Sequence, residues 1–218
     1  DGSLHASSHR GLFTGNRGII HDPATGHSNG RRWTTIAWIC CRLDYGSTRR
    51  SVWGLQNGDR PGWSELFFLD EVTALAAGHR PCHACRRADA IDFARRFDRA
   101  NNLDDSRRSG VSATRRQGAT ARRDRMLHDH RLLSSRLGPS PLPFVELLSL
   151  PDGTMVKVAG GIHAIRGRKA LPWSLAGYGP ARNLGEIALA PLFVLTPRCV
   201  VSTLRSGYAP RWHPTAGS

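Results

Sequence analysis

The hydrophobic residues of this chain fall in short runs separated by turn-forming residues, a pattern typical of short strands and short helices. Residues 33–45 are rich in β-branched and aromatic side chains, which predicts a strand, and residues 64–69 predict a shorter one. Residues 13–30 instead contain many Gly, Asn, Asp and His residues, which predicts a loop with turns. Residues 56–62 predict another loop.

Two helices are predicted in the middle of the chain. Asp70 has the character of an N-cap, and Glu71 follows in the first turn, where the helix dipole favours an anion. The Ala-rich run 72–77 predicts a short helix, and Gly78 is suited to end it in the left-handed conformation. An apolar stripe at helical spacing predicts a second helix over residues 88–100.

The chain changes character after residue 100. Residues 101–125 are poor in apolar side chains and rich in Arg, Ser, Gly and Asp, which predicts a flexible connector or a basic arm. A helical stretch is predicted over residues 122–136. The proline-rich run 138–143 then marks a domain boundary.

The last third of the chain predicts a small β-rich unit. A Gly-Gly pair at residues 160–161 is a hairpin signal between two apolar runs. Strands are predicted over residues 144–150, 154–159, 162–165 and 192–195, and a short helix over residues 198–206.

The balance of charge is the strongest feature of the composition. Lys and Arg number 31 against 17 Asp and Glu, for a net charge of +14, and only two of the cations are Lys. The planar guanidinium fork suits phosphate oxygens, and a strongly basic chain favours a polyanionic partner, most often nucleic acid. An acidic protein or a membrane surface is the alternative partner. Arg-rich codon usage, with no polyanionic partner, is the alternative explanation of the arginines. No apolar run reaches the roughly 18–20 residues of a membrane span.

The cysteines point to a metal site. Cys82 and Cys85 form a Cys-x-x-Cys pair, a spacing that lets two thiolates face one zinc ion. A redox pair of this spacing normally follows a strand in a βαβ unit, whereas this pair follows a predicted helix and an Arg-Pro dipeptide. Zinc is therefore favoured over a disulfide, in a reducing, cytoplasmic setting. Cys199 lies in a Val-rich stretch and is interpreted as a core thiol.

A closed zinc site needs four ligands. Cys41, or otherwise Cys40, is the third, and because neighbouring residues of a strand point to opposite faces, only one of the two faces the metal. His79, three residues before the pair, is the first choice for the fourth ligand. His128 or His130 from the later helix is the alternative. Three ligands and a bound water would instead be typical of a catalytic zinc.

A local resemblance supports the zinc prediction. Phe67-Phe68, followed by Ala74-Leu75-Ala76-Ala77-Gly78-His79-Arg80-Pro81-Cys82-His83-Ala84-Cys85-Arg86, resembles the end of the zinc-binding domain of Ada-type DNA methylphosphotriester repair proteins. The resemblance implies a four-cysteine zinc site on a DNA-contacting module, in which one thiolate accepts a methyl group from DNA. Where the family has Cys-x-x-x-Cys as its first ligand pair, this chain has adjacent cysteines, and His79 replaces an aromatic residue. The methyl-acceptor role is therefore assigned to no residue.

Other residues are secondary candidates. Arg80, Arg86, Arg87 and Arg95 surround the cysteine motif and are predicted to contact nucleic acid. The segment 15–22 could offer backbone N–H groups, Arg17 and His21 to a phosphate, although an ordinary glycine turn is the alternative. Asp124, His128 and Arg131 share one face of the later predicted helix, either as a catalytic group or as a solvated polar face.

These observations predict an α+β protein in two units. Residues 11–137 form a zinc-binding module with short helices and a basic connector, and residues 138–214 form the small β-rich unit. The predicted function is a cytoplasmic, zinc-containing DNA-binding protein in DNA repair or in recognition of modified DNA. One alternative is an enzyme acting on DNA, namely a nuclease, a base-excising enzyme or a thiolate alkyl-acceptor. Another is an RNA-binding zinc protein.

Overall fold

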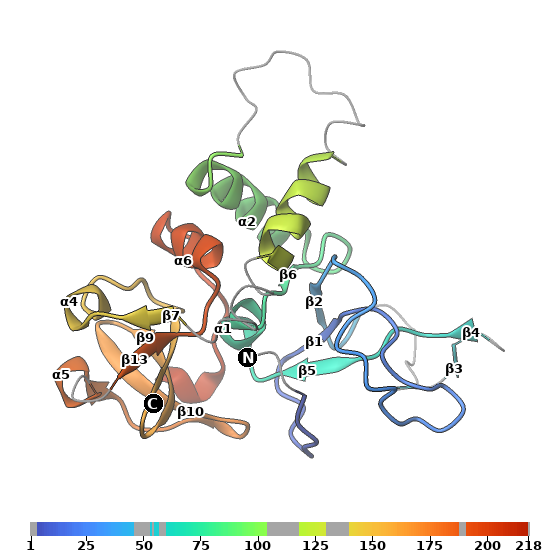
Figure 1. The fold of residues 1–218 in the computed structure, drawn as a ribbon, viewed down its shortest axis with the longest axis horizontal. Helices are drawn as coiled ribbons and strands as arrows, with labels where there is room; N and C mark the ends of the chain where they lie inside the picture. Colours follow the sequence, from blue (N-terminus) through green and yellow to red (C-terminus); the bar gives the residue numbers. More distant parts are fainter. Residues whose placement is uncertain are drawn as a thin grey trace, which may run out of the picture.

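The computed structural model describes residues 4–45, 53, 55–56, 60–103, 118–129, 140–187 and 191–217. The described residues form helices and mainly antiparallel sheets, so the fold is α+β, as the sequence predicts. Figure 1 shows two β-rich parts on either side of the short helix α1, with the longer helices α2 and α6 beside them.

The N-terminal sheet has the strand order β5-β1-β2-β6. Its strands are β1 (Phe13–Asn16), β2 (Ile39–Arg42), β5 (Leu66–Phe68) and β6 (Arg80–Pro81). β1 pairs antiparallel with both β2 and β5, whereas β2 and β6 are parallel. A separate antiparallel pair is formed by β3 (Leu55–Gln56) and β4 (Arg60–Pro61).

Helix α1 (Glu71–Ala76) lies at the centre of the molecule, and every one of its residues is buried. Asp70 caps it as predicted, because the Asp70 carboxylate accepts from Thr73 N at 2.9 Å while Asp70 N donates to Thr73 Oγ1 at 3.1 Å. Gly78 follows with a φ of +82°, the left-handed conformation that the sequence predicts at this helix end.

Helix α2 (Arg87–Ala100) follows the cysteine motif and buries Ala90, Phe93 and Phe97. It packs against α6 (Arg198–Arg205), and Phe93 and Tyr208 meet edge to face with ring centroids 5.2 Å apart. Residues 118–129 are also helical, so the helix predicted from residue 122 is already present at residue 118. Residues 104–117 of the predicted connector and residues 130–136 of the predicted helix lie outside the described part of the chain.

The C-terminal sheet has the strand order β11-β10-β9-β8-β13-β7, and β12 also pairs with β10. Its strands are β7 (Ser140–Leu142), β8 (Met155–Val158), β9 (Gly161–Arg166), β10 (Lys169–Ser174), β11 (Gly177–Tyr178), β12 (Arg182–Asn183) and β13 (Leu192–Val194). The short helices in this part of the chain are α4 (Phe144–Leu147), α5 (Leu184–Ile187) and the 3-10 helix η1 (Pro214–Gly217).

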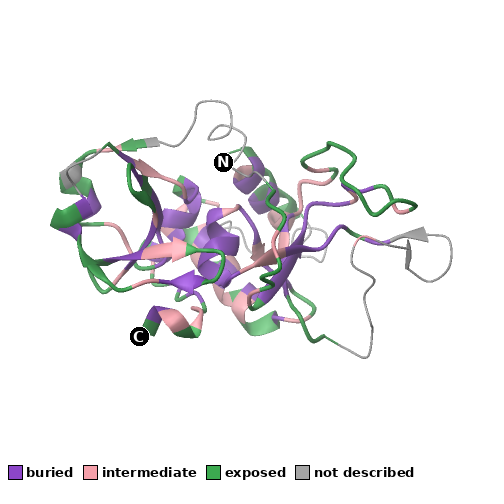
Figure 2. Cartoon of the chain, turned by 90° about the horizontal axis from the view of Figure 1, so that it is seen from below, coloured by how far each residue is buried: buried purple, intermediate pink, exposed green. Residues whose placement is uncertain are grey.

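Two hydrophobic clusters contain residues from both predicted units, with α1 between them. One joins α1 and its flank to the C-terminal sheet through Leu69, Val72, Ala76, Met155, Ala164, Leu171, Tyr178 and Ala216. The other joins the helices through Leu75, Phe93, Phe97, Leu127, Cys199, Val200, Leu204 and Tyr208. Figure 2 shows the buried residues concentrated where the two parts meet. The core is therefore continuous across the boundary predicted near residue 138.

Buried carboxylates at the start of α1 also join the two parts. Asp70 accepts hydrogen bonds from the Tyr178 hydroxyl at 2.8 Å and from His213 N at 3.1 Å. Glu71 accepts from the Tyr208 hydroxyl at 2.6 Å and from Arg211 N at 2.9 Å. Because a buried carboxylate is costly unless its oxygens are satisfied, these bonds fix how the C-terminal part docks on α1.

Several sequence predictions of secondary structure are wrong. Residues 13–16, predicted as loop, form the buried strand β1, and within residues 33–45 only Ile39–Arg42 is a strand. Residues 144–147, predicted as a strand, form the helix α4, which starts immediately after Pro143. The apolar residues of this segment predict a strand, but they do not share a buried face: Val145 is 74% exposed while Leu147 is fully buried. The predicted strands β5, β8, β9 and β13 and the predicted helix α6 are present.

Candidate metal centre

The parallel pairing of β2 with β6 brings the upstream cysteine to the Cys-x-x-Cys pair. Ile39 is in register with Arg80 and Cys40 with Pro81, so Cys41 and Cys82 come next along the two chains. The Cys82 N–H donates to Cys40 O at 3.0 Å, which continues this pairing. Neighbours in register project to the same face of a sheet, and Cys41 and Cys82 therefore lie side by side.

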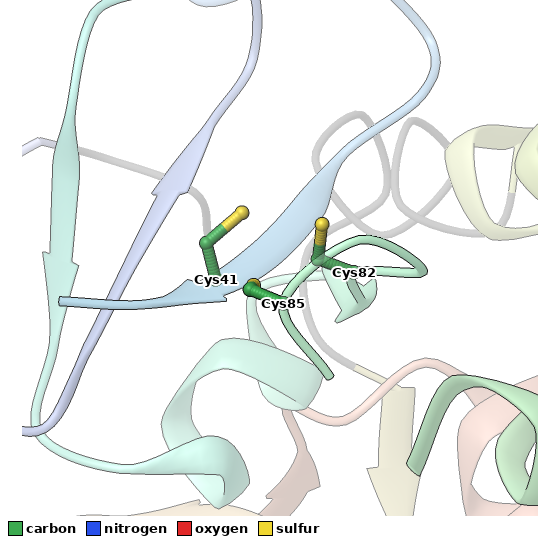
Figure 3. A group of neighbouring side chains, drawn as sticks. All are labelled: Cys41, Cys82 and Cys85. Carbon is green, nitrogen blue, oxygen red and sulfur yellow. The ribbon is translucent and has the colours of Figure 1, made fainter. Parts of the chain in front are cut away.

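A tight turn then returns the chain so that Cys85 faces the same point. Arg86 N donates to Cys82 O at 3.0 Å and so closes the turn, while Arg42 N donates to Cys85 Sγ at 3.4 Å. The sulfur atoms of Cys41, Cys82 and Cys85 all lie within 4.8 Å of one another. Figure 3 shows these three side chains gathered between β2 and the turn that leads into α2. Three sulfurs this close can hold a metal ion.

The pKa values of the three thiols differ because they share hydrogen bonds. The Cys41 thiol and the backbone N–H groups of Cys85 and Ala84 stabilise the Cys82 thiolate, which lowers the pKa of Cys82 to about 4. The same bond to Cys82, together with burial, raises the pKa of Cys41. Burial also raises the pKa of Cys85. The hydrogen bond from Cys41, together with the N–H groups of the turn, therefore favours the thiolate form of Cys82, which is the form that coordinates a cation.

Cys40 lies on the opposite face of the sheet and is not part of the group. It packs with Phe13 and Ala74, and Arg86 Nη1 donates to its sulfur at 3.7 Å. Burial raises the pKa of Cys40 well above its usual value. This separation of adjacent cysteines follows the alternation of a strand, as the sequence predicts.

His79 is also on the opposite face, and the prediction that it supplies the fourth ligand is wrong. Its ring is fully buried and packs against Phe68 and Trp38, at centroid separations of 4.6 and 5.5 Å. A Cβ at Gly15 would lie 3.0 Å from His79 Cδ2. The register pairs Gly15 with Cys40 and Phe13 with Phe68, and Phe13 and Gly15 are alternate residues of β1 that share one face. Gly15 and Phe68 therefore lie on the face of the sheet that carries Cys40.

No other His, Cys, Asp or Glu among the described residues joins the three-cysteine group. His83 is exposed within the turn. His128 is buried and meets Trp33 and Trp38 edge-on, with centroids 5.3 and 5.4 Å away. His130, the other alternative, lies outside the described residues.

Thr14 lies next to the three-cysteine group, a position that the sequence does not reveal. It is in register with Cys41 on the adjacent strand and is 4% exposed. Its Oγ1 has no hydrogen-bond partner among the described residues. A buried hydroxyl without a partner is unusual, and its position on the face of Cys41 places it beside the metal centre. The sequence carries no signal of this position, because residues 13–16 are predicted as a loop.

The four arginines predicted to contact nucleic acid fall into two groups. Arg80 is paired with Asp124 at 2.5 and 2.9 Å, and the Arg86 side chain is only 1% exposed and pairs with Glu71 at 2.7 Å. The prediction is wrong for these two, because their guanidinium groups are used inside the protein. Arg87 and Arg95 are exposed on α2.

Arg86 holds the turn formed by residues 82–86 against helix α1 at the centre of the molecule. Its guanidinium contacts Glu71 and Asp89 and lies over the Phe13 ring, 4.5 Å from the centroid. Burial opposes the charge on Arg86, but Glu71 more than offsets this and raises the pKa of the guanidinium. Because Arg86 directly follows Cys85, the buried ion pair between Arg86 and Glu71 links the cysteine turn to α1.

The secondary candidates are also used within the fold. His21 is buried under Trp53, and its Nδ1 lies 2.5 Å from Ser64 Oγ. The solvated polar face suggested for the later helix is wrong at Asp124 and His128, because both are buried. Arg131 lies outside the described residues.

Comparisons of this chain with known proteins give no match to any family model, curated protein or solved structure. Among the described residues, no helix has the length and apolar character to cross a membrane.

Proposed function

We propose that Cys41, Cys82 and Cys85 supply three of the four ligands of a structural zinc ion. Tetrahedral zinc with sulfur atoms at about 2.3 Å separates those atoms by roughly 3.8 Å. The sulfurs of this group lie within 4.8 Å of one another, so a small closure of the turn satisfies that geometry. Thiolate sulfur is a soft ligand that selects zinc over magnesium or calcium. The fit of the three sulfurs is the observation on which the proposal depends.

The zinc ion would join strand β2 to the turn that starts α2. In the described chain the two are joined by the short β2–β6 pairing and by hydrogen bonds such as Arg42 N to Cys85 Sγ at 3.4 Å. A metal ion bound to sulfurs from both segments supplies folding free energy that such short strands cannot provide alone. On this proposal zinc fixes the fold and takes part in no reaction.

We further propose that the protein binds nucleic acid, with DNA as the preferred form, and that its role is in DNA repair or recognition of modified DNA. The support is the net charge of +14, carried almost entirely by arginine. Exposed arginines of α2, including Arg87, Arg95 and Arg99, are available to phosphates. The local resemblance to Ada-type zinc domains supports DNA over RNA.

A binding titration tests the nucleic-acid proposal. Labelled duplex DNA is titrated with zinc-loaded protein at about 50 and 200 mM salt, and affinity is expected to fall by roughly tenfold or more, because phosphate contacts release counterions. Competition with single-stranded DNA and RNA of the same length then identifies the preferred form. Absence of binding at the lower salt concentration would contradict the proposal.

A further inference from the structure

A cleft between α2 and α6 lies apart from the metal centre. It has a volume of about 530 Å³ and is lined by Arg95, Arg96, Arg99 and Ser206. Arg95 is eight residues after Arg87, the first residue of α2, which corresponds to roughly 12 Å along the helix axis. The cleft therefore belongs to the far half of this helix, where Arg95 alone is predicted from the sequence to contact nucleic acid.

Arg96 is the lining residue of the cleft that is fixed by contacts to both helices. Its Nε donates to Asp92 at 2.9 Å, and its Nη1 donates to the backbone carbonyl of Ser206. Gly207 leaves room for this guanidinium, since a Cβ at that position would lie 2.7 Å from Arg96 Nη1. Gly207 also has a φ of +96°, which favours glycine. Both helices thus hold Arg96 in one orientation.

Arg95 and Arg99 stand beside this fixed group. Residues i and i+4 of a helix are neighbours on one face, so these two side chains project together, with Arg96 adjacent. Arg95 pairs with Asp92 at 2.6 Å and remains 72% exposed. Arg99 has no carboxylate partner among the described residues. Arg95 and Arg96 share one carboxylate, Asp92, and Arg99 adds a third cation, so the described lining of the cleft has an excess of positive charge.

We infer that this cleft binds phosphate groups, and that in the intact function it receives a phosphodiester of the nucleic-acid backbone. The inference rests on the proposed nucleic-acid binding. Guanidinium groups bind phosphate oxygens through paired N–H bonds, and Arg96 is already oriented by protein contacts, so little conformational entropy is lost when an anion binds. Backbone phosphates carry no sequence information, so the cleft positions the nucleic acid without selecting its sequence.

The test compares two double variants that remove the same charge. Arg95→Gln with Arg99→Gln removes the two exposed cations of the cleft. Lys169→Gln with Arg182→Gln removes two exposed cations from β10 and β12 of the other sheet. The cleft variant is expected to lose roughly tenfold in affinity for duplex DNA and to lower the slope of log affinity against log salt by about 2. The control variant is expected to stay within about twofold of wild type. Equal losses in both variants, or none in the cleft variant, would overturn the inference.

A second ligand separates this inference from the proposed function. Inorganic tripolyphosphate is titrated into wild-type and cleft-variant protein by calorimetry, with circular dichroism to verify that both are folded. Binding by wild type that is lost in the variant supports the cleft even when no nucleic acid binds, and only the proposed function then fails. If wild type binds DNA and the cleft variant binds DNA and tripolyphosphate equally well, the proposed function stands and the inference about the cleft is contradicted.

Discussion

Adjacent side chains of this protein have different roles because strands and turns send them in different directions. Cys41 faces Cys82 and Cys85, whereas Cys40, one residue earlier, packs under the sheet with Phe13. Arg86 is buried against Glu71, whereas Arg87, the next residue, is exposed. Each pair offers a natural comparison, because the two residues are chemically identical and differ only in their surroundings.

The cysteine pair predicts opposite results for metal binding. Cys41→Ala is expected to lose the zinc, because the two sulfurs that remain cannot hold the ion firmly. Cys40→Ala is expected to retain one zinc per chain and to lose only about 1 kcal/mol of stability from the small buried thiol. Elemental analysis of both purified variants measures this. Equal zinc content in the two variants would refute the ligand assignment.

The arginine pair predicts opposite results for stability. Arg86→Gln leaves Glu71 buried without its cation and is expected to cost about 3–5 kcal/mol of unfolding free energy. Arg87→Gln, on the exposed side of α2, is expected to stay within about 0.5 kcal/mol of wild type. Urea denaturation compares the two. A stable Arg86→Gln protein with weakened DNA binding would instead support the sequence-based prediction that Arg86 contacts nucleic acid.

At the scale of elements, the sequence predicts those whose signals are local. The N-cap Asp70, the Ala-rich run and Gly78 specify α1, and the apolar stripe specifies α2. β1 was missed because its residues, Phe13–Asn16, owe their burial to pairing with β2 and β5, which are distant in sequence. The choice between Cys40 and Cys41, and the exclusion of His79, likewise needed the register of that sheet. Long-range pairing is not visible in local patterns.

The capping box of α1 gives a prediction at the same scale. Thr73→Val keeps the shape of the side chain but removes the hydroxyl that accepts from Asp70 N and donates to Asp70 O. Because α1 is fully buried, the loss is expected to cost about 1–2 kcal/mol in thermal or urea unfolding. Zinc content should be unchanged. A variant as stable as wild type would show that the cap contributes nothing beyond what packing provides.

For the whole molecule, the buried pairs Tyr178–Asp70 and Tyr208–Glu71 connect the start of α1 to the C-terminal part of the chain. The hydroxyls donate at 2.8 and 2.6 Å to carboxylates that are themselves buried. Burial first, and then the neighbouring Asp70 or Glu71, raises the pKa of each tyrosine above its usual value near 10.0. Both tyrosines therefore remain protonated in the folded protein at pH values where they ionise in the unfolded chain.

This shift predicts loss of stability at alkaline pH. Since the folded state holds the tyrosine protons more tightly, the unfolded state releases them first, and stability falls as pH rises above about 10. Below that pH the contribution is fully present. Tyrosinate absorbance should rise together with unfolding, and the double variant Tyr178→Phe with Tyr208→Phe should be less stable at neutral pH but less sensitive to alkali. Full ionisation of both tyrosines in the folded protein near pH 10 would contradict the assignment.

X-ray absorption at the zinc edge of the purified protein tests the central claim most directly, because it reports both the metal and its ligands. The structure predicts a zinc signal with at least three sulfur neighbours at about 2.3 Å. Protein that contains no zinc, or zinc surrounded only by oxygen and nitrogen, would contradict the claim that Cys41, Cys82 and Cys85 form a metal centre.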